Sequence, residues 1–96
     1  HLYTLEAALA SVDSRIAANY RAQENIKQEL TSIAAKMIAA DTTTEQRLTM
    51  VTRTAELGRR HGELNAEIQQ LERDRAYAER EALDYREALA GTFTPP

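Results

Sequence analysis

One side of the segment from Leu2 to Ala40 carries core-type residues at alternating spacings of three and four, without a slip. These seam positions are Leu2, Leu5, Leu9, Val12, Ile16, Asn19, Gln23, Ile26, Leu30, Ile33, Met37 and Ala40. Such spacing keeps one face of a helix against a partner helix for more than five heptads, and the segment contains neither proline nor glycine. The pattern predicts a coiled-coil helix over residues 2–40.

A second seam follows, and a short polar stretch separates it from the first. In residues 41–45, Thr42 with Glu45 and Thr43 with Gln46 have the spacing of a capping box, so a helix is predicted over residues 43–90. A short connection makes two helices antiparallel neighbours. The predicted fold is therefore all-α, a long antiparallel helical hairpin assembled into an oligomeric bundle. A single uninterrupted helix is the alternative, because no glycine ends the first helix. The second seam reads Leu57, His61, Leu64, Ile68, Leu71, Arg75, Ala78, Ala82, Tyr85 and Leu89.

The repeat changes phase at the start of the second helix. Leu48, Val51 and Ala55 do not share the phase that begins at Leu57, which predicts a bend or an altered supercoil there. Two glycines one turn apart follow, and each costs about 1 kcal/mol in a helix relative to alanine. Residues 58–62 therefore suggest close helix packing, a hinge that would make a three-helix bundle, or contact with an anion. The candidate anion contacts are Arg53, Arg59 and Arg60.

A polar layer interrupts both seams at the same level. If the chain folds about residues 42–43, Gln23 falls near His61, and Asn19 lies one turn away. Buried amides that need partners penalise wrong registers, so Asn19, Gln23 and His61 are predicted to specify pairing. A ligand site in the bundle core is the less favoured alternative. The same folding lets Arg75 reach Asp13 or Glu6.

The carboxyl end is predicted to leave the helix at Gly91. Glycine suits a left-handed cap after Ala90, and Pro95 and Pro96 cannot continue a helix. Residues 91–96 are thus expected to form an extended tail with Phe93 as a hydrophobic anchor, within a single domain of residues 1–96.

Composition narrows the function. The 96 residues carry a net charge of −3 with both signs interspersed, and contain no cysteine. No set of nucleophile, base and orienting group is apparent, so enzyme activity is not expected, nor is a cofactor or metal. Acidic residues accompany most arginines, so nucleic acid is not expected as a direct ligand. No apolar run reaches the roughly 20 residues that span a bilayer. We expect a soluble chain, with a cytoplasmic location favoured; the start at His1 leaves an upstream anchor open.

The predicted function is a non-enzymatic oligomerisation or scaffolding module. Its partner would be itself, as a dimer or higher oligomer, or another helical protein. The alternatives are an adaptor or inhibitor that uses the same apolar face, the oligomerising segment of a DNA-handling assembly of the phage packaging or partition kind, and a rod detached from an envelope anchor. Apolar residues expected outside the intrahairpin seam are Ala8, Ala22, Leu48, Val51 and Leu83. The predicted oligomer or partner interface comprises Leu2, Leu5, Leu9, Val12, Ile16, Ile26, Leu30, Ile33, Leu57, Leu64, Ile68 and Leu71.

Overall fold

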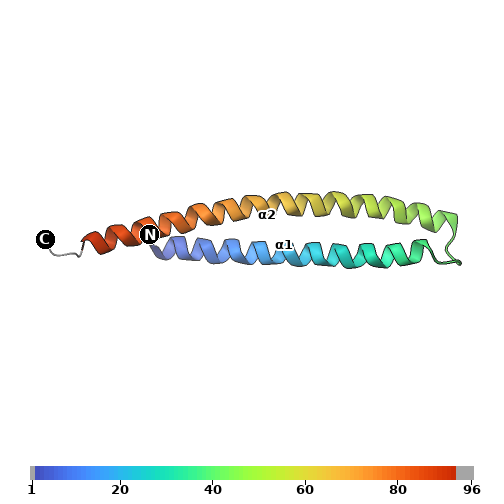
Figure 1. Cartoon of the computed structure of the whole chain (residues 1–96), viewed down its shortest axis with the longest axis horizontal. Helices are drawn as coiled ribbons and strands as arrows, with labels where there is room; N and C mark the ends of the chain where they lie inside the picture. The colour runs from blue at the N-terminus through green and yellow to red at the C-terminus, as the bar shows by residue number, and fades with distance from the viewer. Residues whose placement is uncertain (1, 93–96) are drawn as a thin grey trace. The chain divides into compact units, whose positions relative to one another are not determined.

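The computed structural model describes residues 2–92, and it contains two helices. Helix α1 is Leu2–Met37 and helix α2 is Thr44–Thr92 (Figure 1). No strand occurs within these described residues. The predicted all-α helical hairpin is confirmed. The described residues form two compact units, one of residues 2–18 and 68–92 and the other of residues 19–67.

In the unit of residues 19–67, the end of α1 and the start of α2 run antiparallel and are joined by residues 38–43. Its apolar core is formed by Ile26, Leu57 and Leu64, and the side chains packed against this core are Ala22, Leu30 and Ile33. Ala22 was expected outside the seam, and this expectation is wrong. It lies one turn before Ile26, close enough to the seam for its methyl group to join the core.

The turn ends α1 three residues before the predicted boundary, because side chains take over its last carbonyl groups. Thr42 Oγ1 donates to the Lys36 carbonyl at 2.6 Å, and the Arg47 guanidinium donates to the carbonyls of Met37 and Ala39 at 3.2 and 3.3 Å. These bonds satisfy acceptors that would otherwise lack a partner at a helix end. The connection is therefore held by side chains from both of its ends.

Helix α2 starts with the capping box predicted for Thr43 and Gln46. The Thr43 amide donates to Gln46 Oε1 at 2.9 Å, and the Gln46 amide donates to Thr43 Oγ1 at 3.1 Å. Two amide groups are thus satisfied reciprocally, which fixes the first turn of α2.

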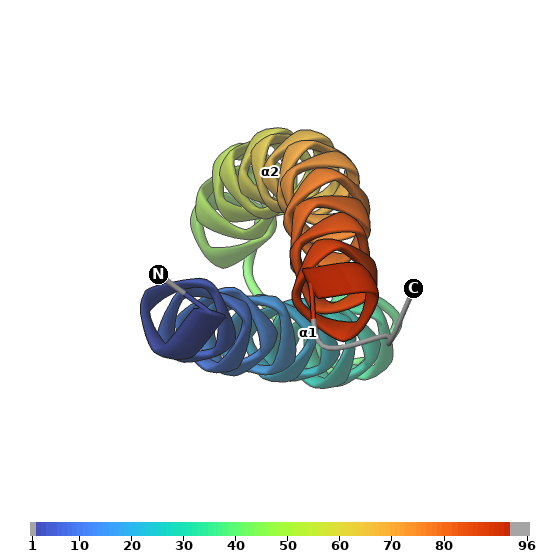
Figure 2. The ribbon, with the colours of Figure 1, turned by 90° about the vertical axis from the view of Figure 1, so that its left-hand side faces the viewer.

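In the unit of residues 2–18 and 68–92, the two helical segments also run antiparallel. Arg75 Nε donates to Asp13 Oδ1, which confirms the predicted pair, and Arg86 pairs with Glu6. Figure 2 shows the first turns of α1 in blue and the last turns of α2 in red, both at the end that faces the viewer. The buried residues of this unit are Leu5, Ile68, Leu71 and Ala82.

Two sequence predictions about α2 are wrong, and the hinge that was one of three alternatives for residues 58–62 does not occur. There is no break at residues 58–62, where the helix is continuous. There is no change of phase before Leu57, because the partly buried Arg47 and Met50 already follow the seam that continues through Leu57. Finally, Gly91 does not cap the helix, since α2 continues to Thr92 and no described glycine has a positive φ. Phe93 and the rest of the predicted tail, residues 93–96, lie outside the described residues.

Candidate functional site

The polar layer lies inside the hairpin, in the unit of residues 19–67. Gln23 is the buried polar residue of the described chain, with 7% of its surface exposed, and its Nε2 donates to the His61 carbonyl at 3.4 Å. Gln23 and His61 therefore meet as predicted. The acceptor is the backbone oxygen of His61, however, so the imidazole is not required for this bond.

Asn19 contributes differently to this layer. Its Nδ2 is buried, and no acceptor for it lies among the described residues. An amide nitrogen buried without a partner costs roughly 1–3 kcal/mol, so we expect an apolar residue at position 19 to stabilise the hairpin. The contact described for this layer thus joins an amide side chain to a backbone carbonyl group.

The predicted interface residues face the other helix of the same chain. Six of them are buried, namely Leu5, Ile26, Leu57, Leu64, Ile68 and Leu71. The other six, Leu2, Leu9, Val12, Ile16, Leu30 and Ile33, are partly buried. The hairpin seam therefore uses the most apolar residues of both helices.

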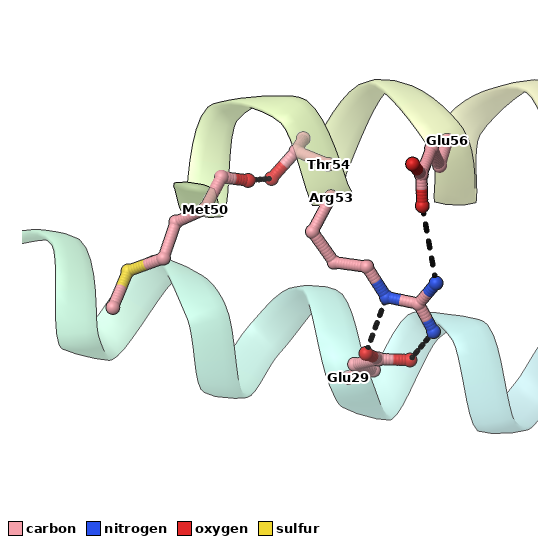
Figure 3. A network of polar contacts seen from close by, with 5 residues as sticks. All are labelled: Glu29, Met50, Arg53, Thr54 and Glu56. Carbon is pink, nitrogen blue, oxygen red and sulfur yellow. Dashed lines mark hydrogen bonds and ion pairs between the residues drawn. The ribbon is translucent and has the colours of Figure 1, made fainter. Parts of the chain in front are cut away.

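The candidate anion contacts are largely paired with carboxylates. Figure 3 shows Arg53 reaching from α2 to Glu29 on α1, with Nε and Nη2 donating to the two carboxylate oxygens at 2.9 and 3.2 Å. Arg53 also contacts Glu56 at 3.3 Å. The hydrogen bond from Arg53 lowers the pKa of Glu29, and the hydrogen bond to Glu29 raises the pKa of Arg53. Both groups thus stay charged and neutralise one another.

Arg59 is paired in the same way, because it contacts Glu63 one helical turn away. Of the three arginines, Arg53 and Arg59 thus form ion pairs with neighbouring carboxylates. A phosphate approaching this surface would meet Glu29, Glu56 and Glu63 as well. The Arg53–Glu29 pair joins the two helices and the Arg59–Glu63 pair lies within α2, and both place carboxylates beside the arginines of the candidate anion site.

Leu48 and Val51 lie outside the seam as expected, but the continuation of their face along α2 was not predicted. Leu48 and Val51 are exposed by 65% and 54%, and Ala55, Gly58 and Gly62 continue the same spacing with exposed surfaces. We call these five residues the outer stripe. Each follows a seam position by one residue, which places the outer stripe about 100° around α2 from the seam. Their offset from the Leu57 phase was the signal that could have identified a second face.

The two glycines of the outer stripe do not serve packing within the chain. A Cβ atom added at Gly58 or at Gly62 would meet no atom of the described chain within 4 Å. Close packing between α1 and α2 therefore does not explain them. The other predicted exposed residues, Ala8 and Leu83, are exposed as expected and lie in the other unit.

Two properties of residues 2–92 bear on metal binding and on membrane insertion. No group of three histidine, aspartate or glutamate side chains is placed to hold a metal ion within residues 2–92. Neither described helix combines the length and the apolar character needed to cross a bilayer. A comparison of the chain with protein-family models, with curated protein sequences and with solved structures found no match.

Proposed function

We propose that this chain is a non-enzymatic oligomerisation module, a helical hairpin that brings proteins together by associating with copies of itself. The supporting observation is the outer stripe. Scattered exposed apolar residues are common on protein surfaces, but Leu48, Val51 and Ala55 share one helix face at heptad spacing. An amphipathic helix face of this kind is the feature that binds another helix.

The rest of the structure supports an interaction role over a chemical one. Ion pairs between α1 and α2 occur in both units and include the Arg53–Glu29 and Arg75–Asp13 pairs. The seam is filled by side chains of α1 and α2, whereas the outer stripe is exposed to a partner. Binding of a different helical protein to that face, as an adaptor or inhibitor, is the alternative.

The test is the mass in solution, measured by light scattering on a sizing column over a hundredfold range of concentration. We expect a mass above that of one chain, rising with concentration. Val51→Glu should lower this mass, whereas Tyr77→Glu, which replaces another exposed apolar residue outside the outer stripe, should leave it unchanged. A single-chain mass at every concentration, with the helical circular dichroism intact, would overturn self-association and favour the adaptor alternative.

A further inference from the structure

The side chains of the outer stripe become smaller along its length. It runs from the large Leu48 and Val51 through Ala55 to Gly58 and Gly62, all within the unit of residues 19–67. One end therefore projects apolar side chains, while the other presents bare backbone that a neighbour can approach. The empty space around an added Cβ at both glycines shows that no segment of the described chain uses this approach.

The outer stripe lies on the side of the hairpin away from the Arg53–Glu29 ion pair. Arg53 precedes a seam position by one residue and bridges to Glu29 on one side, as Figure 3 shows. The outer stripe follows the seam positions and so lies on the other side. On α1, the positions that follow the seam include the exposed Thr31 and Ala34, which are small enough to let a neighbouring helix approach.

This gradient of size is complementary to itself when two copies of α2 run antiparallel. In one register Leu48 faces Gly58 of the second copy, and Val51 faces Ala55 of the second copy. By two-fold symmetry each of these contacts occurs twice, and every large side chain is opposite a small one. A parallel pairing would instead set Leu48 against Leu48 and leave the glycines facing each other across a gap.

The same register is complementary in charge. Glu45 and Arg59 lie along one edge of the outer stripe, near its two ends. Antiparallel pairing brings Glu45 of each copy to Arg59 of the other, while Thr52 lies at the two-fold axis between them. In the single chain Arg59 contacts Glu63 at an exposed position, so it can join Glu45 of the second copy at the edge of the interface.

Because size and charge select the same register, we propose that the outer stripe binds a second copy of this chain through an antiparallel, two-fold contact between the two α2 helices. This inference rests on the proposed self-association and specifies its surface and geometry. The contact is short, so the dimer should dissociate on dilution.

Cross-linking tests the geometry directly, because the chain contains no cysteine of its own. Thr52→Cys places a thiol at the two-fold axis, and Thr49→Cys is the matched control. Both threonines are exposed on α2, and each donates its hydroxyl to the carbonyl four residues earlier, at 3.3 and 3.2 Å. With a short bis-maleimide, we expect Thr52→Cys to be cross-linked to dimer at least about tenfold faster than Thr49→Cys. If light scattering shows an oligomer but the two variants are cross-linked at equal rates, the antiparallel geometry is overturned and the proposed function stands. If light scattering shows only the mass of one chain, both the geometry and the proposed function are overturned.

Two sets of substitutions test the contacts separately. Gly58→Leu fills the space that Leu48 of the second copy would occupy, so it should raise the dimer dissociation constant at least about tenfold. Gly91→Leu, at another glycine with open space around it, should not change it. Glu45→Arg and Arg59→Glu should each raise the dissociation constant about fivefold, and their combination should restore it. Failure of the combination to restore dimerisation, or equal effects at Gly58 and Gly91, would rule out the proposed register.

Discussion

Replacing the buried amide of Gln23 by leucine is expected to stabilise the hairpin. The Gln23 Nε2 to His61 carbonyl distance of 3.4 Å is long for an amide hydrogen bond, whose usual length is about 2.9–3.0 Å. The acceptor lies within α2, where the His61 carbonyl also receives the helical hydrogen bond from four residues later. Removing Gln23 therefore leaves no acceptor without a partner.

The magnitude follows from two opposing terms. Burying an amide costs about 1–3 kcal/mol, and a hydrogen bond returns about 0.5–1.5 kcal/mol in net stability. The bond of Gln23 lies at the weak end of that range, and leucine adds apolar surface beside Ile26 without a large change in volume. We expect Gln23→Leu to raise the free energy of unfolding by about 1 kcal/mol. For a chain of this length, that corresponds to an increase in the thermal midpoint of about 4–8 °C.

The assay is thermal and urea unfolding followed by circular dichroism at 222 nm, at one fixed chain concentration because association also stabilises. Gln28→Leu, on an exposed face of α1, is the matched control and should change the stability by less than about 0.5 kcal/mol. Asn19→Leu should gain at least as much as Gln23→Leu, because the Asn19 Nδ2 has no acceptor among the described residues. A loss of 1 kcal/mol or more in Gln23→Leu would show that the amide stabilises the fold and would refute this reasoning.

Three further predictions concern the cap, the core and the ion pair. Thr43→Ala removes one half of the capping box and should lower the free energy of unfolding by about 1 kcal/mol, measured by urea unfolding; no loss would mean that Gln46 alone holds the turn. Leu64→Ala opens a cavity in the buried cluster and should lower the free energy of unfolding by about 2–4 kcal/mol. Leu48→Ala, at a residue with 65% of its surface exposed, should lower it by less than about 1 kcal/mol under conditions in which the chain is monomeric. Similar losses in the two variants would contradict the assignment of the seam. Arg53 lowers the pKa of Glu29, so the pair contributes stability above the unfolded pKa of Glu29, and this contribution is lost as the pH falls through the folded pKa. Glu29→Gln should therefore show a smaller fall in thermal midpoint between pH 7 and pH 3 than the unchanged chain. The same pH profile in both chains would show that the pair adds nothing to stability.

Much of the fold could be predicted because it depends on local signals. The heptad seam of α1 fixes its buried face, and the box of Thr43 and Gln46 fixes the start of α2. Once the turn is placed, antiparallel geometry sets the register, so Gln23 meets His61 and Asp13 meets Arg75. These contacts follow from spacing along the chain alone.

The buried face of the first turns of α2 could not be assigned by hydrophobicity, because Arg47 and Thr54 occupy seam positions there. Arg47 occupies a seam position and donates to the carbonyl groups that end α1. Thr54 occupies the seam position that precedes Leu57. The more apolar Leu48 and Val51 therefore suggested the wrong phase. The helix through Gly91 was missed because the glycine was interpreted as a left-handed cap. Glycine permits such a cap but does not require it, and the backbone continues as a helix.

The position of the outer stripe limits the kind of assembly that it can form. Consecutive residues on a helix are about 100° apart, so the outer stripe and the seam give α2 two adjacent faces. Each helix of a four-helix bundle contacts its two neighbours through two faces that are separated by nearly this angle around its axis. The corresponding small residues of α1, Thr31 and Ala34, lie on the same side of the hairpin. Two hairpins joined through the outer stripe would thus close into a bundle that buries both copies of the stripe. A closed contact of this kind stops at two chains, so the mass should level off at twice that of the chain; continued growth with concentration would instead indicate a head-to-tail contact between unlike surfaces.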